Sequence, residues 1–432
     1  MLKQKRTGKI WVPDLDLPRV VIIGSGFAGM SLVRKLRNKP FHVILLDQNN
    51  YHQFQPLLYQ VATSGLEPDS ITFPIRKLFK GQKNFVFRMA KVEHIDPQIK
   101  TVYCDVGSIE YDYLVLATGS VTNFFGLNEI ESNSIGLKSI NDSLNIRSLM
   151  LQNLEKATLT DDANEREELT SIVIVGGGPA GVEMAGAMAE FKKFILPTDY
   201  PYLTGDLMKI YLVEAGPRLL SAMSERSSET TFRDLTKMDV NILLKTSVQS
   251  FDGHLALISE GKSIRAATLV WTAGVQGTFP AGLDMSKVVR GNRLKVNSYS
   301  QVEGFDDIFA IGDVGSMVSE TLPMGHPMVA PAAIQQGEQL AENLYRLTKD
   351  KDLVPFEYKN KGSLATIGKK RAVADMGKLH YRGFPAWLVW STVHLLSIIG
   401  FRNKIMVGLN WLGSYLTYDK GNRLIIRRYR KQ

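Results

Sequence analysis

The chain has 432 residues, of which 44% are hydrophobic and 22% are charged, and its formal net charge is +9. This length suffices for two or three domains with their own cores, and the composition excludes disorder for most of the chain. The positive charge favours an anionic partner, which leaves a phosphate-bearing cofactor, a membrane surface and nucleic acid open.

The N-terminal stretch MLKQKRTGKIWVPDLD is basic but precedes no apolar run, so we expect neither a secretory signal nor a transit peptide. A single cysteine, Cys104, excludes an internal disulfide and a CxxC redox pair. The seven histidines lack metal-ligand spacing. We therefore expect no metal site and a reducing compartment.

A β-branched strand that starts at Val20 runs through G-x-G-x-x-G into a helical pattern, VVIIGSGFAGMSLVRKL. In this motif the first glycine makes a tight turn, the second admits a pyrophosphate to the backbone, and the third lets helix and strand pack closely. The helix N-terminus then offers free N–H groups to the phosphates. The next strand, FHVILLD, ends at Asp47, whose carboxylate would accept hydrogen bonds from a ribose hydroxyl. The stretch predicts a dinucleotide site.

The same pattern returns at Ile172 in IVIVGGGPAGVEMAGAM, and its following strand, KIYLVE, ends at Glu214. Because a carboxylate repels a 2′-phosphate, Glu214 favours NADH over NADPH. The interval before this strand is longer than in the first copy. Its excess lies in FKKFILPTDYPYLTGD, whose prolines and glycine predict an insertion between helix and strand.

Two landmarks repeat at nearly the same distance. Gly24 and Gly176 are 152 positions apart, and the stretches LVLATGS from Leu114 and LVWTAGV from Leu269 are 155 positions apart. Such a repeat indicates a duplicated domain, so we expect two bound dinucleotides.

The C-terminal stretch AWLVWSTVHLLSIIG, Ala386 to Gly400, carries no formal charge. As a helix it would span only about 22 Å, short of the roughly 30 Å hydrocarbon core of a bilayer. We interpret it as a surface-lying membrane anchor, with a buried helical pair at a subunit interface as the alternative. The headgroup region would suit three tryptophans and the basic tail: Trp387, Trp390, Trp411, Arg427, Arg428, Arg430 and Lys431.

A further strand, DDIFAIGDVGS, ends in Gly312 and Asp313. Together with the first glycine motif and LVLATG, it resembles flavoprotein pyridine nucleotide reductases. Four more stretches are similar to one family, the type II NADH dehydrogenases, or single-subunit NADH:quinone oxidoreductases: NYHQFQPLLYQVATSGLEP, VGGGPAGVEMAGAMAE, GSLATIGKKRAVADM and the C-terminal run from Ala386. The resemblance covers Arg19 to about Arg427.

The resemblance implies an α/β fold with two Rossmann-like dinucleotide-binding domains of the glutathione-reductase-like, FAD/NAD(P)-binding kind, followed by a C-terminal amphipathic helical membrane-binding region. The domains implied are an FAD-binding domain at residues 19–125 and 291–348, an NADH-binding domain at 126–290, and a membrane-binding region at 354–432.

It also implies a non-proton-pumping enzyme that passes a hydride from NADH to non-covalently bound FAD and then reduces a membrane quinone, ubiquinone or menaquinone, by two electrons. We expect it to lie peripherally on the cytoplasmic face of a bacterial plasma membrane, on anionic lipid, with a homodimer among its expected states and no nucleic-acid partner.

The site residues follow from the same resemblance. Glu183 would influence proton delivery beside the nicotinamide, with a helix-dipole role as the alternative. Lys370 would stabilise negative charge on the reduced flavin, with a solvated basic pair with Lys369 as the alternative. The nucleotide sites would comprise, for FAD, Gly24, Ser25, Gly26, Phe27, Ala28, Gly29, Asp47, Val92, Ala117, Thr118, Gly119 and Asp313, and for NADH, Gly176, Gly178, Pro179, Ala180, Gly181, Glu214, Ala273 and Gly274.

One departure concerns the quinone pocket. The family commonly shows A-Q-x-A-x-Q, whereas this chain has Pro331 after Ala330, in place of the first glutamine. We therefore expect quinone to be positioned by Gln335, Gln336 and apolar walls.

Two other functions stay open. A soluble NADH-dependent flavin reductase that serves a protein acceptor such as a ferredoxin would use both nucleotide sites, but it has no reason to carry the apolar, basic C-terminal region. A non-enzymatic NADH-sensing flavoprotein of the apoptosis-inducing-factor kind is the second. Disulfide and sulfide:quinone reductases need paired cysteines, which Cys104 alone does not supply.

Overall fold

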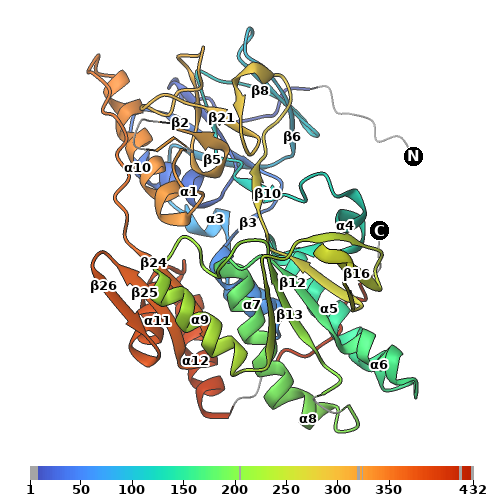
Figure 1. The fold of residues 1–432 in the computed structure, drawn as a ribbon. Helices are drawn as coiled ribbons and strands as arrows, with labels where there is room; N and C mark the ends of the chain where they lie inside the picture. Colours follow the sequence, from blue (N-terminus) through green and yellow to red (C-terminus); the bar gives the residue numbers. More distant parts are fainter. Residues whose placement is uncertain (1–7, 204–205, 319–321, 324, 418–420, 430–432) are drawn as a thin grey trace. The chain divides into compact units, whose positions relative to one another are not determined.

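The computed structural model describes residues 8–203, 206–318, 322–323, 325–417 and 421–429. Its chain divides into two compact units, which are drawn in Figure 1 and described separately below. The first unit consists of Met1–His52, Phe73–Val121 and Val275–Asn360, and the second of Gln53–Thr72, Thr122–Gly274 and Lys361–Gln432.

The first unit is built on a five-stranded parallel sheet with the order β22-β9-β1-β2-β5. Its strands are β1 (Arg19–Ile23), β2 (His42–Asp47), β5 (Phe85–Met89), β9 (Tyr113–Leu116) and β22 (Ile308–Ala310). Continuous apolar runs such as VVII in β1 are buried on both faces, as expected for a parallel sheet covered by helices. The main helices are α1 (Phe27–Lys35) and α10 (Ala330–Leu347), and an antiparallel sheet contains β6 (Val92–Asp96), β7 (Thr101–Cys104) and β8 (Gly107–Glu110).

The second unit repeats this plan, with a parallel sheet in the order β11-β18-β12-β13-β14. Its strands are β11 (Ile135–Gly136), β12 (Ile172–Val175), β13 (Ile210–Glu214), β14 (Val240–Leu244) and β18 (Thr268–Trp271), and the antiparallel sheet contains β15 (Val248–Phe251), β16 (Leu255–Ile258) and β17 (Ser263–Arg265). Each glycine motif joins the central strand of its sheet to a helix. The duplication predicted from the repeats is therefore present in the topology.

The smaller elements complete both units. In the first or at its edges are β3 (Tyr51–Gln53), β4 (Thr72–Pro74), α3 (Ile75–Leu78), β10 (Ser120–Thr122), β19 (Val275–Gly277), η5 (Met285–Lys287), β20 (Val288–Val289), β21 (Arg293–Lys295), η6 (Gly312–Val314) and β23 (Gly315–Ser316). In the second are η1 (Gln55–Leu57), α2 (Leu58–Ala62), η2 (Pro68–Ser70), α4 (Asn128–Asn133), α5 (Ile140–Ala157), α6 (Ala163–Thr170), α9 (Glu225–Thr236) and η4 (Ser259–Gly261).

The predicted insertion after the second glycine helix begins later than expected. Helix α7 (Pro179–Glu190) continues into a π-helical turn, η3 (Phe191–Ile195), and then into α8 (Leu196–Asp199). Phe191, Ile195 and Leu196 are buried, so tertiary packing keeps this segment helical. Proline is tolerated there because it falls in the first turn of α8.

The C-terminal part of the second unit holds a three-stranded antiparallel sheet that the sequence did not indicate: β24 (Ser363–Gly368), β25 (Arg371–Met376) and β26 (Leu379–Arg382). Two helices follow, α11 (Phe384–Ser397) and α12 (Phe401–Thr417). The helix expected over Ala386 to Gly400 is thus confirmed within about three residues. Among the helices that the structure describes, none has the length and apolarity needed to cross a membrane.

Small residues on α7 let β24 approach it closely. A Cβ atom added at Gly186 would lie 2.1 Å from the carbonyl oxygen of Ile367, so only glycine fits between the two elements. This contact brings the backbone of β24 against the helix that carries Glu183.

Candidate active site

Each predicted nucleotide site contains the same glycine cradle. In the first, Gly24 has a φ of +105°, and a Cβ atom there would lie 2.3 Å from the carbonyl oxygen of Ala117. A Cβ atom at Gly29 would lie 2.0 Å from the carbonyl oxygen of Gly24. Gly26 has no neighbour within 4 Å of such an atom, and it caps α1 without a side-chain hydrogen bond. The cradle is therefore tight against the sheet and open at the helix N-terminus, the kind of position at which helices bind phosphate groups.

The second cradle matches the first. Gly176 has a φ of +109°, and a Cβ atom there would lie 2.7 Å from the Cα atom of Ala273. At Gly181 the corresponding distance to the carbonyl oxygen of Gly176 is 1.9 Å, whereas Gly178 again has open space around it. Pro179 begins α7, a position where its missing N–H costs nothing.

Asp47 at the end of β2 and Glu214 at the end of β13 accept hydrogen bonds from their glycine cradles. Both the backbone N–H and the hydroxyl of Ser25 donate to Asp47 Oδ2 at 2.7 Å. In the second unit the backbone N–H of Gly177 donates to Glu214 Oε2 at 2.5 Å, and that of Gly216 donates to Oε1 at 2.6 Å. A carboxylate has about four acceptor positions, so each acid retains capacity for a ribose hydroxyl. The guanidinium of Arg218 is held by its own loop, where Nη1 donates to the carbonyl oxygen of Met223 and Nη2 to that of Ser221.

The loop that carries Asp313 lies beside the first cradle. A Cβ atom at Gly312 would lie 3.2 Å from that of Ala28, and the Ser120 hydroxyl donates to Asp313 Oδ2 at 2.5 Å. The backbone N–H of Gly312 donates to Gln336 Oε1 at 2.7 Å. Three segments far apart in sequence thus meet at the first cradle, as the flavoprotein resemblance implied.

His52 is a residue of this cradle that the sequence reasoning missed. It is 3% exposed, and its Nδ1 lies 2.9 Å from the carbonyl oxygen of Ser25, so Nδ1 carries the proton. Burial lowers the pKa of His52, which keeps the ring neutral and leaves Nε2 as an acceptor. That nitrogen has no partner in the part of the chain that the structure describes. A buried orphan acceptor beside a glycine cradle fits a bound cofactor rich in hydroxyl groups, as FAD is.

The remaining predicted nucleotide residues lie near the same ends of their sheets or on adjacent strands. Ala117, Thr118 and Gly119 form the turn after β9, where the Thr118 hydroxyl donates to the carbonyl oxygen of Thr278. Ala273 and Gly274 occupy the corresponding turn after β18, and Val92 begins β6 half-buried.

Glu183 lies in the second turn of α7, not in its first turn, so the helix-dipole alternative loses its basis. Glu183 is 7% exposed, and its Oε1 accepts hydrogen bonds from the backbone N–H of Thr366 and from Trp390 Nε1, both at 3.3 Å. Oε2 has no hydrogen-bond partner among the described residues. Burial raises the pKa of Glu183 to about 8. A carboxyl group in this state holds a proton at neutral pH and can release it.

The two lysines lie in the turn between β24 and β25. Lys370 has a φ of +66°, and the backbone N–H of Lys369 donates to Glu190 Oε1. Burial lowers the pKa of Lys369. The role predicted for Lys370 at the flavin stays a prediction.

The start of α10 explains the departure at Pro331. Ala330 and Pro331 open the helix, and proline is favoured in a first turn because its φ angle is already helical. Of the two glutamines, Gln336 is buried and bound to Gly312. The amide of Gln335 pairs with the backbone N–H and carbonyl of Lys359, both at 3.0 Å, so this geometry disfavours a role in quinone binding.

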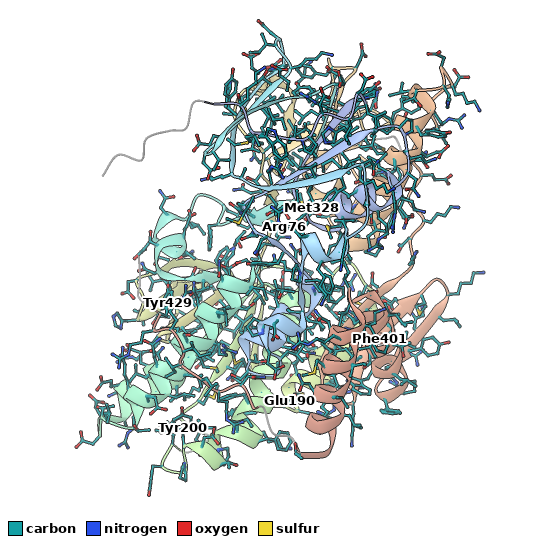
Figure 2. All side chains as sticks on the ribbon, turned by 180° about the vertical axis from the view of Figure 1, so that it is seen from behind. Arg76, Glu190, Tyr200, Met328, Phe401 and Tyr429 are labelled. Atoms are coloured by element: carbon teal, nitrogen blue, oxygen red, sulfur yellow. The ribbon has the colours of Figure 1, made fainter. Side chains whose placement is uncertain are left out.

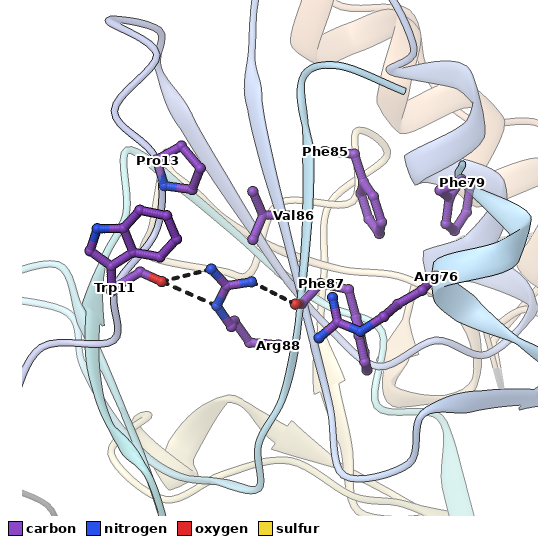
Figure 3. Close-up of a pocket in the computed structure, with 8 residues that line it drawn as sticks. All are labelled: Trp11, Pro13, Arg76, Phe79, Phe85, Val86, Phe87 and Arg88. Carbon is purple, nitrogen blue, oxygen red and sulfur yellow. Dashed lines mark hydrogen bonds between the residues drawn. The ribbon is translucent and has the colours of Figure 1, made fainter. Parts of the chain in front are cut away.

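A cavity of about 340 Å³ lies at the edge strand β5 of the first unit and contains none of the predicted site residues (Figure 3). The Arg88 guanidinium donates to the carbonyl oxygens of Trp11 and Phe87, as the dashed lines show. The lining residues are Trp11, Pro13, Arg76, Phe79, Phe85, Val86, Phe87 and Arg88. Because its guanidinium donates to the backbone at Trp11, Arg88 stabilises the N-terminal segment around that residue.

Two nucleotide cradles on duplicated α/β sheets define a dinucleotide-binding oxidoreductase, and the model of the pyridine nucleotide-disulphide oxidoreductase family matches residues 18–337. A second family model, the NDH2 C-terminal domain, matches residues 360–418. The chain is 34% identical to the type II NADH:quinone oxidoreductase NdhA of Mycobacterium tuberculosis, over 94% of this chain and 89% of that protein. It is 32% identical to Ndh of the same organism, over 94% of this chain and 90% of that protein. The chain belongs to the type II NADH:quinone oxidoreductase family.

Solved structures agree at the level of the fold. A structure of NDH2 from Plasmodium falciparum in complex with NADH superimposes with a TM-score of 0.87 at 21% identity, covering 95% of this chain and all of that one (100%). The sulfide:quinone oxidoreductase of Aquifex aeolicus gives a TM-score of 0.71 at 20% identity, over 90% of this chain and 92% of that one. The predicted fold class is confirmed, and family membership favours the NADH:quinone activity over the two alternative functions.

Proposed function

We propose that this chain carries out the NADH:quinone oxidoreductase activity of its family with FAD in the cradle of the first unit, NADH in that of the second, and Glu183 as the proton-holding group for the quinone. FAD bound there would supply the redox chemistry that links hydride transfer from NADH to two-electron reduction of a quinone. The residues that would hold it are the first glycine motif, Asp47, Asp313 and His52. Glu214 would bind the NADH ribose and disfavour a 2′-phosphate.

The buried carboxyl group of Glu183 carries this proposal. A quinone that takes up two electrons also takes up two protons, and a general acid is most effective when its pKa lies near the working pH. Glu183 meets this condition because burial opposes its ionisation while two N–H donors favour it. The free Oε2 is the atom from which the proton would leave.

The test separates the two halves of the reaction in Glu183→Gln. Reduction by NADH, followed as loss of flavin absorbance in a stopped-flow instrument, should keep its rate within about twofold. Reoxidation by a short-chain quinone should slow by about 100-fold or more, because one general acid contributes about 10²- to 10⁴-fold. Unchanged steady-state kinetics with both substrates would refute the role of Glu183.

We also propose that α11 and α12 bind a membrane surface. Their outward faces carry apolar side chains at helical spacing, with Phe401 80% exposed at the start of α12, where Figure 2 labels it. The stripe, named here the apolar stripe, consists of Phe384, Leu388 and Leu396 on α11 and Phe401, Ile405, Leu409 and Leu412 on α12. Exposed patches of this kind mark membrane or protein contacts.

The structure corrects two parts of the anchor predicted from the sequence. Trp390 is 2% exposed and turns inward, away from any headgroup region. In the basic tail, Arg427 donates to Asn145 Oδ1 at 2.6 Å and Arg423 pairs with Asp199 at 2.5 Å, so these charges serve the protein itself. Arg430 and Lys431 lie outside the described residues. Arg402, beside the apolar stripe, lies 3.6 Å from Asp69 in an ion pair whose two side chains are 69% and 66% exposed. Arg428 is also exposed. The proposed anionic-lipid contact therefore rests on Arg402 and Arg428, and Arg402 would have to exchange Asp69 for a lipid headgroup.

The membrane in question is proposed to be the bacterial plasma membrane, approached from its cytoplasmic face, where NADH is available. The family relatives include bacterial and mitochondrial proteins, so fractionation of the native host decides this point. A homodimer would cover the apolar stripe instead, and sedimentation equilibrium without lipid distinguishes that arrangement.

A further inference from the structure

Helix α11 has two faces with different neighbours. Its outward face carries the apolar stripe, whereas Ala386 and Trp390 are 0% and 2% exposed on the inward face. There the indole Nε1 of Trp390 donates to Glu183 Oε1 at 3.3 Å. An indole N–H can only donate, so this contact favours the charged form of the carboxyl group.

The indole ring of Trp390 is fixed by two aromatic neighbours. The His394 ring stacks on it with centroids 4.2 Å apart, and the Trp411 ring lies 5.3 Å away. His394 is anchored by its Nδ1, which lies 2.8 Å from the carbonyl oxygen of Trp390, and Trp411 Nε1 donates to Gln60 Oε1 at 2.8 Å. Such packing from α2, α11 and α12 leaves Trp390 little freedom to turn away from Glu183.

We propose that Trp390 is a positioning residue for Glu183. The indole N–H of Trp390 orients the carboxyl group of Glu183 and keeps the carboxyl proton exchangeable in quinone reduction. This inference rests on the proposed function of Glu183. A carboxyl group buried without the indole donor would hold its proton more tightly and return it to a quinone less readily.

No charged side chain among the described residues bonds to Glu183, so the indole N–H has no ionic competitor there. Titratable groups come from several of the elements packed here: Tyr59 from α2, whose pKa the Glu183 charge helps to raise, and His394 from α11, which stacks on Trp390. Two turns further along α7, Glu190 accepts from the backbone N–H of Lys369, in the turn that also carries Lys370. Burial raises the pKa of Tyr59 and lowers that of His394 to about 4, so both are neutral near pH 8. Tyr59 and His394 therefore stay uncharged while Glu183 titrates.

The experiment compares the pH dependence of quinone turnover in the flavin-loaded full-length protein, Trp390→Phe and Trp387→Phe. Activity of the unchanged protein should fall as pH rises through about 8, where Glu183 loses its proton. Loss of the donor should move this limb to higher pH by about one unit in Trp390→Phe, because a hydrogen bond to a charged group is lost. Trp387 is the matched control, since it lies on the same helix and stacks on Phe384.

A second readout is the infrared band of the protonated carboxyl group, assigned by its absence in Glu183→Gln and titrated in the same variants. A limb that stays in place in Trp390→Phe, or moves equally in Trp387→Phe, overturns the positioning role. A limb that persists in Glu183→Gln overturns the proposed function instead. If Trp390→Phe loses its fold, benzothienylalanine at position 390 keeps the bicyclic shape without the N–H, and the same two outcomes decide.

Discussion

Glu183 makes the stability of the protein depend on pH, because burial keeps its carboxyl group protonated at a pH where an exposed glutamate is charged. Its pKa is about 8 in the folded protein, against an ordinary value of 4.5. Between these values only the folded state holds the proton, so the stability of the protein falls as pH rises from 4.5 to 8 and stays reduced above 8. The full difference corresponds to at most roughly 5 kcal/mol.

Replacing Glu183 with glutamine should remove this dependence. The amide oxygen still accepts from Thr366 and Trp390, but the side chain cannot ionise. We expect the variant to match the unchanged protein at pH 5 and to melt at a higher temperature at pH 9, by several degrees. Thermal melting at pH 5, 7 and 9 measures this, with Glu229→Gln, an exposed acid on α9, as the control. A gain that is the same at all three pH values would show that ionisation of Glu183 is not its cause.

The second glycine of each cradle allows the two nucleotides to be told apart. A side chain at Gly26 or Gly178 meets no protein atom within 4 Å of its Cβ, so valine there should leave the fold intact and occupy the phosphate space. We expect Gly26→Val to be purified with little or no flavin. Gly178→Val should keep its flavin and raise the KM for NADH at least tenfold. If Gly178→Val lost its flavin and Gly26→Val raised the KM for NADH, FAD and NADH would have to be assigned to the opposite cradles.

At the scale of elements, the sequence predicts the features that depend on residues close together in the chain. The strand-glycine-helix units, the acids at Asp47 and Glu214 and the helix over α11 depend on residues within a few turns of one another. The sheet of β24, β25 and β26 was missed because its alternation is short, and its place is set by Gly186, about 180 positions earlier. Trp390 was misread as a headgroup residue because α11 is apolar on both faces, so its sequence has no periodicity that separates inside from outside.

The apolar stripe is a property of two helices together, so it should be tested as a set. Serine at Leu388, Leu396, Ile405 and Leu409 removes apolar surface without touching Trp390 or Glu183. Each burial of a leucine or isoleucine contributes about 1.5–3 kcal/mol, so binding to vesicles of mixed neutral and anionic lipid should fall by more than 100-fold. Leu159→Ser is the control, because that side chain is 86% exposed outside the stripe. If the fourfold variant still sediments with the vesicles, the membrane contact does not lie on the apolar stripe.

At the scale of the whole molecule, the chain crosses between its two compact units more often than a simple domain insertion requires. The segment Gln53–Thr72 belongs to the second unit although it follows the first acid directly, and Lys361–Gln432 belongs there too. Repeats and motif spacing give the order of the nucleotide sites along the chain. They do not reveal that α2, β24 and α11 supply the neighbours of Glu183, because these contacts join segments with no shared pattern. The assignment of domain boundaries to FAD and NADH remains a prediction.

This division of the chain predicts how a C-terminal truncation behaves. Removal of residues 361–432 leaves all three segments of the first unit but strips β24 and α11 from α7, exposing Glu183 and its buried apolar neighbours, among them Met184 and Ala185. We expect a truncated protein that keeps flavin but whose second unit melts at a much lower temperature, because several fully buried side chains, including Ile367, Val373 and Trp390, are lost with the segment. Calorimetry with flavin fluorescence as a second probe would show two separated transitions, of which only the one without a flavin signal moves.

Arg423→Ala provides the comparison, since the ion pair with Asp199 accounts for about 1 kcal/mol or less of stability. Loss of flavin together with the C-terminal segment would mean that the first unit depends on the second for its fold.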